Sequence, residues 1–360
     1  MNLGLFIMPL HPPEKLPADS YAEDLELLSV ADELGFTEAW VGEHMTAKWE
    51  NIVAPDLFIS RGFGVTKNMR LGTGVYLLSV HHPADIATRA AFLDHLSRGR
   101  YNFGVGVGSV PSDRPFKGVP PEAEEMVGRF RESLDIILQL WEAEPPWKYE
   151  GKYWTVELSD EWKELDMGYP LRPYTLPHPP IGIPGFSPDS RSMFEAGKRG
   201  WWALSTNLAA NRILGTHHVK YCEGLEAGGH PVDASGWRVA REVFVADTDR
   251  EALDYAVNGP MGQTFTRYML PLSKRNIPGG LLTYKDDPDM PDSDVTLEYL
   301  ANNVWLVGSP ETVAEKIERL RDQQGKFGTL LAIAHDWADR SRAVNSLQLL
   351  ADKVRPALAD

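Results

Sequence analysis

Eight short apolar runs recur along the chain, separated by segments with helical spacing such as Tyr21, Leu25, Leu28 and Ala31. The runs lie at 2–8, 38–42, 70–78, 101–107, 180–184, 201–205, 239–246 and 328–334. They lack polar alternation, which is typical of parallel strands buried on both faces. Eight strand-and-helix units predict a (β/α)8 TIM barrel. A doubly wound open sheet is the alternative, but it usually has fewer strands and an early glycine fingerprint that the first run lacks.

Three stretches exceed what a minimal barrel needs, and they lie at 109–121, 144–180 and 258–303. The first two are rich in proline and aromatic residues, and the third contains an acidic loop, KDDPDMPDSD. Long loops after barrel strands build the active-site face. We therefore expect residues 1–360 to form one barrel domain with three insertions over that face, the last of them a mobile lid.

The charge balance excludes polyanionic partners. The chain has 51 acidic and 36 basic residues, a formal charge of −15, and no basic run. Nucleic acid and acidic membrane surfaces are therefore not expected as partners. Cys222 is the single cysteine, the start MNLGLFIMPLHPPEK lacks the features of a signal peptide, and no apolar stretch could cross a bilayer. These features predict a cytoplasmic protein.

Several conspicuous residues follow the predicted strands. The second strand is followed by GEHMTAKWENI, with Glu43, His44 and Trp49, and for His44 a catalytic and a structural role remain equally open. Glycines and one tyrosine mark the third and fourth strands: Gly72, Gly74, Tyr76, Gly104, Gly106 and Gly108. Glycine within a strand indicates either close approach of a ligand or room for a bulky barrel neighbour.

The stretch GFSPDSRSMFEAGKRG follows the fifth strand and has the features of a helix start. Ser187 suits the N-cap, and Pro188 suits the first helical position. Free N–H groups at such a start can bind an anion, and a helix that only caps itself is the alternative. On the same face as a glycine-rich strand and a histidine, a phosphate-bearing cofactor is the better interpretation.

Other catalytic chemistries find little support. His81 and His82 precede Pro83 and suggest capping, whereas His217 and His218 are expected to be solvated on a helix. No histidine pair has the spacing of a zinc helix, so no metal site is predicted. GFSPD departs from the nucleophile-elbow motif GxSxG. A bound organic cofactor is the remaining source of reactivity.

Five ordered motifs resemble the bacterial luciferase-like flavin monooxygenases. They are VGEHM at 41–45, HHPADIATRAAFLDHLSRGRYNFGVGVGS at 81–109, LWEAEPPWKYEGKYW at 140–154, GFSPDSRSMFEAGKRG at 185–200 and VGSPETVAEKIERL at 307–320. The segments HMTAKWENIVAPDLF and GPMGQTFTRYMLPL are most similar to the branch that contains the diketocamphane and limonene-type monooxygenases. The resemblance implies a barrel, usually a homodimer, that takes reduced FMN from a separate flavin reductase.

The resemblance also implies a reaction and its site. Oxygen would add at the flavin C4a carbon, and the peroxide would attack a small apolar substrate such as a cyclic ketone, by Baeyer–Villiger insertion, or a terpenoid. His44 would lie at the reacting part of the flavin, and Gly74–Val75 would form a cis peptide bond beneath the ring. The implied cofactor-binding set is Gly74, Val75, Tyr76, Gly106, Gly108, Ser109, Gly185, Phe186, Ser187 and Ser190.

For the substrate wall, the candidates are Trp49, Tyr76 and Trp305. Luciferase has a phosphate-binding arginine after the fourth strand, where this chain has Val107, so Arg114 or Arg191 would have to replace it. Two other functions remain open on the same barrel. One is hydride transfer with a deazaflavin, although the acidic loops offer few basic groups for its acidic tail, and the other is flavin binding without turnover.

Overall fold

The computed structural model describes residues 1–108, 110–120, 122–277 and 279–358. Eight parallel strands form a closed barrel, because β3 pairs with β5 and joins the two ends of the strand order. The barrel strands are β1 (Asn2–Leu10), β2 (Glu38–Val41), β3 (Arg70–Thr73), β5 (Tyr101–Gly106), β8 (Ile181–Gly185), β9 (Trp202–Ser205), β10 (Trp237–Arg241) and β13 (Thr329–His335). Each of the eight predicted runs overlaps one of them. The TIM barrel prediction is confirmed, and the open-sheet alternative is wrong.

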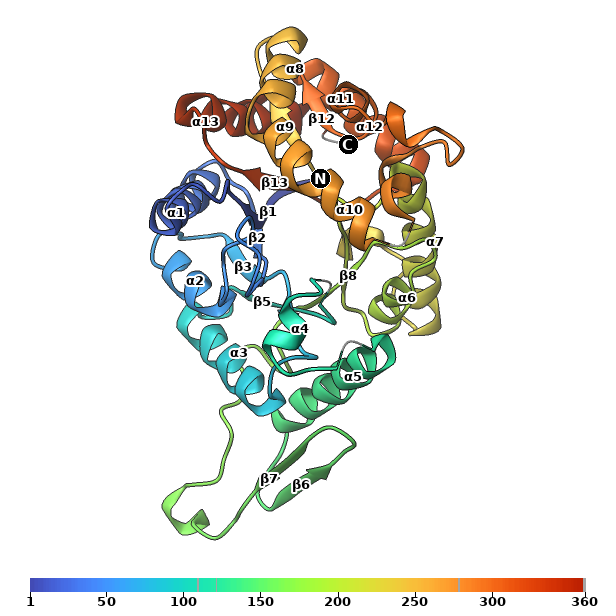
Figure 1. Ribbon diagram of the computed structural model, residues 1–360. Coiled ribbons are helices and arrows are strands. Elements are labelled where there is room, and N and C mark those ends of the chain that lie inside the picture. The colour runs from blue at the N-terminus through green and yellow to red at the C-terminus, as the bar shows by residue number, and fades with distance from the viewer. Residues whose placement is uncertain (109, 121, 278, 359–360) are drawn as a thin grey trace.

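Helices surround the strands as a ring (Figure 1). They are α1 (Pro17–Glu33), α2 (Pro55–Gly62), α3 (Pro83–Ser97), α4 (Asp113–Phe116), α5 (Ala123–Leu140), α6 (Arg191–Lys198), α7 (Asn211–Ala227), α8 (Asp249–Asn258), α9 (Pro260–Thr264), α10 (Leu270–Asn276), α11 (Leu297–Asn303), α12 (Pro310–Gln324), α13 (Arg340–Leu349) and α14 (Arg355–Ala357). Short strands lie outside the barrel or extend it: β4 (Tyr76–Leu77), β6 (Trp147–Glu150), β7 (Thr155–Leu158), β11 (Val243–Val245) and β12 (Leu306–Gly308). Within the described ranges, no helix has the length and hydropathy that a membrane span requires.

One tryptophan fills the middle of the barrel and explains four of its glycines. Trp40 is fully buried, and its indole donates to Glu38 Oε1 at 2.9 Å. A Cβ at Gly72, Gly74, Gly104 or Gly182 would come within 2.7–2.9 Å of this side chain. These positions therefore accept only glycine while the tryptophan is present. For Gly72, Gly74 and Gly104, this is the packing explanation that the sequence left open.

The three insertions are connected to the barrel in different ways. The segment 109–121 directly follows β5, whereas 258–303 follows α8 and reaches the loop after β2, where the Tyr268 hydroxyl donates to Glu50. The segment 144–180 instead connects α5 to β8, and its Thr175 N–H binds Asp94 near the end of α3. The end of this segment therefore lies at the amino ends of the strands, whereas its β6–β7 hairpin projects away from the barrel (Figure 1) and carries Trp154, which packs on His82 at the start of α3 with ring centroids 5.0 Å apart. The prediction that all three insertions follow barrel strands is wrong, because α5 precedes 144–180 and α8 precedes 258–303.

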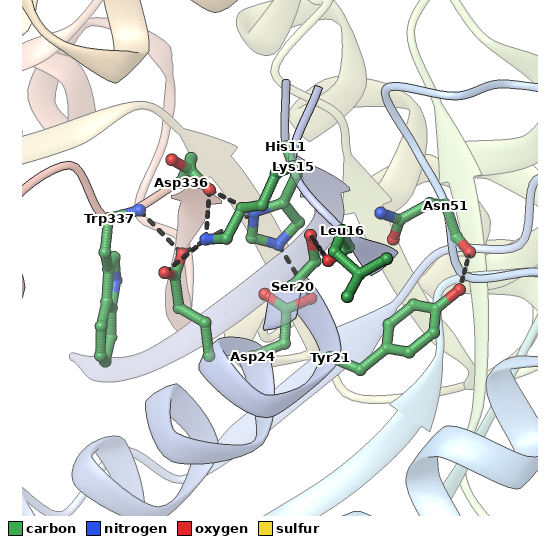
Figure 2. Close-up of polar contacts among 10 residues, drawn as sticks. His11, Lys15, Leu16, Ser20, Tyr21, Asp24, Asn51, Asp336 and Trp337 are labelled. Carbon is green, nitrogen blue, oxygen red and sulfur yellow. Dashed lines mark hydrogen bonds and ion pairs between the residues drawn. The ribbon is translucent and has the colours of Figure 1, made fainter. Parts of the chain in front are cut away.

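A buried ionic cluster joins the first and last strands of the barrel (Figure 2). His11 follows β1; its Nδ1 lies 2.7 Å from Asp336 Oδ1, beyond β13, and its Nε2 lies 3.1 Å from Asp24 Oδ2 on α1. Lys15 Nζ lies 2.6 Å from both Asp336 and Glu23. Carboxylates that could otherwise share a metal ion with His11 therefore already hold an ammonium group. Burial lowers the pKa of His11, but the bonds to Asp24 and Asp336 outweigh it and raise the pKa to about 9.

We expect this cluster to make stability depend on alkaline pH. The folded-state pKa of His11 exceeds its unfolded value, so its contribution is complete below pH 6.5 and is lost as the pH rises through about 9. The loss in the free energy of unfolding should be on the order of 3 kcal/mol. Urea unfolding measured from pH 6 to pH 10 checks this. His11→Gln should flatten the dependence, and the exposed variant His95→Gln should retain it; equal slopes in all three proteins would contradict the assignment.

Candidate active site

The carboxyl end of the barrel has two unlike halves. Side chains alternate between the inside and the outside of the barrel along each strand. The residue two positions after each one that contacts Trp40, or that shares its core, therefore points inward one layer closer to the carboxyl end. These mouth residues are Met8, Gly42, Gly74, Gly106, Pro184, Thr206, Glu242 and His335. Four neighbouring strands, β2, β3, β5 and β8, contribute only glycine and proline. This half of the mouth is therefore an open surface on which a flat molecule can lie.

The other half of the mouth is polar and incompletely satisfied. Among the described residues, no hydrogen-bond partner is found for Thr206 Oγ1, Glu242 Oε2 or either ring nitrogen of His335, although these atoms are buried. Buried polar atoms without partners are costly in a finished core. Atoms of this kind at the carboxyl ends of barrel strands indicate a ligand site.

The buried carboxylate of Glu43 holds the loop after β3, which forms part of the glycine-lined half of the mouth. The Gly74–Val75 peptide bond is cis, as the family resemblance implies. Glu43 Oε2 accepts a hydrogen bond from the Leu77 N–H at 3.0 Å, and its Oε1 lies 2.5 Å from His81 Nε2. His81 therefore supports the buried carboxylate that holds this loop. His82, in contrast, caps α3 as predicted by accepting from the Ala84 N–H.

His44 lies on the same face between two carboxylates from different loops. Its Nε2 is 2.8 Å from Glu50 Oε2, and its Nδ1 is 3.8 Å from Asp113 Oδ2. The first residue of α4, Asp113, accepts bonds from Thr46 Oγ1 at 2.5 Å and from the Met45 N–H at 3.2 Å. The Nδ1 side of the ring is thus beyond hydrogen-bond distance of its carboxylate and available to a ligand.

The two carboxylates make His44 a cation at neutral pH. Burial lowers the pKa of His44, but the negative charges of Glu50 and Asp113 outweigh it and raise the pKa to about 10. Burial likewise opposes ionisation of Asp113, yet the positive charge of His44 and the bond from Thr46 hold its pKa below the ordinary value. The imidazolium can therefore donate a hydrogen bond or a proton at Nδ1.

An aromatic wall from the 258–303 segment covers this ionic group. Tyr268 stacks on Trp49 with ring centroids 5.6 Å apart, and its hydroxyl donates to Glu50 Oε1 at 2.6 Å. Arg267 lies over the Trp49 ring at 5.1 Å and pairs with Glu14. In Figure 1, α9 and α10 lie inside the ring of outer helices on this side. Trp49 and the Tyr268 part of the third insertion therefore lie beside His44, and their place at an active-site face stays a prediction.

The helix after the fifth barrel strand begins later than predicted. Asp189 has φ +49°, and α6 starts at Arg191 with Ser190 as its N-cap residue. The assignment of Ser187 as N-cap and Pro188 as first helical residue is wrong, because a residue in the left-handed region cannot lie within a right-handed helix. Ser187 and Phe186 are exposed in the turn ahead of the helix. A Cβ on Gly185 would lie 3.1 Å from Ser190 Oγ, so glycine lets the helix start approach the strand end.

A buried histidine holds this turn in place. His217 Nε2 lies 2.8 Å from the Ser187 carbonyl oxygen, and its Nδ1 lies 2.8 Å from Ser205 Oγ. Trp237 Nε1 donates to the same hydroxyl at 2.8 Å, so Ser205 donates to Nδ1 and the neutral ring donates from Nε2. Burial lowers the pKa of His217, consistent with the neutral form. The expectation that His217 is solvated is wrong, because the helix turns this residue toward β9 and β10.

The remaining predicted site residues lie in different parts of the structure. Tyr76 packs against Phe103, which packs against Trp141 of α5, so the ring faces the outer helices. Its assignment to the substrate wall is wrong, and only its backbone lies at the strand end. Trp305 is buried and packs on Phe265, which belongs to the 258–303 segment, with ring centroids 4.7 Å apart. Gly108 follows β5 with φ +93°, and Ser109 lies outside the described residues.

The two arginines considered for an anion lie in different places. Arg191 is the first residue of α6 and is exposed beside Ser190. Arg114 follows Asp113 in α4, on the His44 side of the mouth. Val107 packs with the apolar cluster of Leu77, Val80 and Met126 and offers no donor to an anion. The geometry therefore favours Arg191 over Arg114 at the turn before α6.

Comparison with known proteins agrees with this architecture. Residues 1–325 match the family described as luciferase-like monooxygenase. The chain is 33% identical to 3,6-diketocamphane 1,6-monooxygenase of Pseudomonas putida over 99% of this chain and 98% of that one. It is 30% identical to limonene 1,2-monooxygenase of Rhodococcus erythropolis, covering 99% and 86%.

A solved structure of the oxygenating constituent of 3,6-diketocamphane monooxygenase from P. putida, a type II Baeyer–Villiger monooxygenase in complex with FMN, superimposes with a TM-score of 0.92. It shares 34% identity over 100% of both chains. An F420-dependent secondary alcohol dehydrogenase, at 18% identity and a TM-score of 0.71, shares the fold alone. The chain therefore belongs to the luciferase-like monooxygenase family.

Proposed function

We propose that this protein is an FMN-dependent monooxygenase that uses reduced FMN and O2 to insert oxygen into a small cyclic ketone. The observation that carries the proposal is the cationic His44 beside the open, glycine-lined half of the barrel mouth. The diketocamphane relatives support the ketone, and the limonene relative keeps a terpenoid as the alternative substrate. A relative named as the oxygenase component of a trigonelline monooxygenase supports a separate flavin reductase as the source of reduced FMN.

The residues of this chain fit FMN. A planar ring system can lie against Gly74, Val75 and Gly106, where no long side chain projects into the mouth. The unpartnered atoms of Thr206 and His335 can meet polar atoms at the ring edge. Ser187, Ser190 and the free N–H groups at the start of α6 can hold the phosphate, with Arg191 adding positive charge.

The chemistry divides between the cofactor and the protein. Reduced FMN, when bound, activates O2 for transfer to the substrate. His44 can donate a hydrogen bond or a proton from Nδ1, and Glu50 and Asp113 stabilise its charged form. Trp49 and Tyr268 exclude water from this group, which prevents unproductive loss of activated oxygen as hydrogen peroxide.

Ketone oxygenation with an unrelated NADH-dependent flavin reductase tests the proposal. We expect lactone formation from a bicyclic ketone, with FMN and O2 both required. Turnover of an alcohol with a deazaflavin, without oxygen uptake, would establish hydride transfer in its place. Tight FMN binding with no product from ketones or terpenes would indicate a flavin-binding protein without turnover.

We further propose that two copies of the chain pair through α2 and α3. These neighbouring helices expose Leu57, Phe92 and Leu96, which are 70%, 54% and 52% accessible, and Val53 is exposed just before α2. Several exposed apolar side chains on neighbouring helices are typical of a protein interface.

A charge on this face should give a monomer. Phe92→Glu combined with Leu57→Glu places two carboxylates against an apolar surface, where burial without a partner is strongly unfavourable. Sedimentation velocity should show a dimer for the unmodified protein and a single chain for the double variant. Val219→Glu changes an equally exposed apolar residue on α7 and should leave the dimer intact. A dimer that survives the double change would exclude this interface.

A further inference from the structure

Glu242 is a buried carboxyl group at the carboxyl end of a barrel strand, and the mechanism above does not use it. It immediately follows β10 and is 1% exposed. Asn207, which follows β9, donates from Nδ2 to Glu242 Oε1 at 2.6 Å. No partner is found for Oε2 within the described residues, although this atom is fully buried. One oxygen of the group is therefore fixed, and the other is open to a ligand.

Aromatic side chains gather near the end of β10. The Leu306 N–H donates to the Glu242 carbonyl at 2.9 Å, which brings the neighbouring Trp305 to the end of β10. Phe265 packs on Trp305 at 4.7 Å and on Tyr284 at 5.8 Å. An apolar aromatic surface with a single oriented polar group is the usual composition of a site for a small, mostly apolar molecule.

Burial favours the protonated form of this carboxyl group. It raises the pKa of Glu242 to about 7, while the bond from Asn207 and the charge of Arg241 act in the opposite direction. The Arg241 guanidinium binds the Ala209 carbonyl and Asn211 Oδ1, on the far side of the strand. Tyr284, the other titratable group facing Glu242, is itself buried and neutral. A protonated carboxyl group can donate one hydrogen bond.

We propose that Glu242 binds the carbonyl oxygen of the ketone substrate by donating a hydrogen bond from Oε2, while Asn207 holds Oε1. The inference rests on the proposed ketone oxygenation and adds the residue that orients the substrate. A ketone offers one acceptor on an otherwise apolar body, which matches one donor beside Trp305 and Phe265. The bond polarises the carbonyl and strengthens as negative charge develops on its oxygen.

A matched pair of probes tests the proposal on the unmodified protein. Norcamphor and 2-methylenenorbornane have similar shapes, but the second has a CH2 group in place of the carbonyl oxygen. With oxidised FMN bound, calorimetric titration should give an affinity for norcamphor at least roughly tenfold above that for the alkene. Equal affinities, or no binding of either probe, would overturn the assignment.

Two variants then locate the donor. Glu242→Gln keeps an N–H donor beside the bond from Asn207 and should retain most of the preference for norcamphor. Glu242→Ala should abolish the preference, with FMN affinity unchanged within about twofold. Loss of the preference in Glu242→Gln would overturn the proposal, because glutamine still offers a donor at this position, as would a preference that survives in Glu242→Ala.

The Glu242→Ala variant also shows whether the carbonyl group bound by Glu242 belongs to the substrate or to the flavin. If Glu242→Ala weakens binding of FMN and riboflavin but not the preference between the probes, the donor serves a flavin carbonyl and the substrate assignment is wrong. Failure of the proposed function has a different signature. In that case the unmodified protein would form no lactone from norcamphor with reduced FMN, while the difference in probe affinity would persist.

Discussion

His44→Asn should lower the yield of oxygenated product by roughly 10²–10⁴-fold, the range for loss of a proton-donating group. In the unmodified protein, Glu50 beside Nε2 and Asp113 3.8 Å from Nδ1 favour the charged imidazole, and no hydrogen bond within the described residues occupies Nδ1. Asparagine can donate a hydrogen bond but not a proton, and it removes the positive charge between Glu50 and Asp113. Oxygen consumption with reduced FMN should continue and appear as hydrogen peroxide, measured beside the product.

The pH dependence offers an independent check on the same residue. The folded-state pKa of His44 is raised to about 10, so the charged form is present throughout the neutral range and is lost only as the pH rises through that value. The ratio of product to oxygen consumed should therefore stay level from pH 6.5 to pH 9 and fall above it. His82→Asn, which preserves an N-cap acceptor at the start of α3, should match the unmodified protein. A half-maximal ratio near pH 6.5 would show that His44 is not held by its carboxylates.

The barrel could be predicted from the sequence because its strands are buried on both faces. Parallel strands must then be apolar throughout, and each of the eight runs contrasts with the polar, helical segments around it. The position of a residue after a strand was equally informative, since it placed His44 and Trp49 at the active-site face. The same reasoning failed for 144–180 and 258–303, because a helix, α5 or α8, separates each insertion from the preceding strand.

Partners brought together by the fold could not be predicted. Glu50 and Asp113 are 63 positions apart, and only the meeting of two loops places both beside His44. The orientation of Tyr76 depends on which side of a strand faces the helices after a cis peptide bond, which a run of residues does not show. Trp40 gives the clearest case, because one side chain requires glycine on three other strands that are far away in the sequence.

The other large expected effect concerns the phosphate of FMN. His217→Leu should weaken FMN binding by roughly tenfold to a hundredfold, equivalent to about 1–3 kcal/mol for a buried polar group left without its partner. His217 does not contact the proposed phosphate site; it positions the Ser187 carbonyl through Nε2 and is itself fixed by Ser205. Leucine removes both bonds, so the turn that carries Ser187 and leads to Ser190 is no longer held in place.

Riboflavin and a conservative variant separate this role from a general loss of stability. Riboflavin has the same ring but no phosphate, so its affinity should be nearly equal in the unmodified protein and in His217→Leu. His217→Gln retains a side-chain N–H that can donate to the Ser187 carbonyl, and it should recover most of the FMN affinity. Fluorescence titration measures all of these affinities. If His217→Leu weakens FMN and riboflavin by the same factor, the turn before α6 does not hold the phosphate, and the phosphate must bind elsewhere around the mouth.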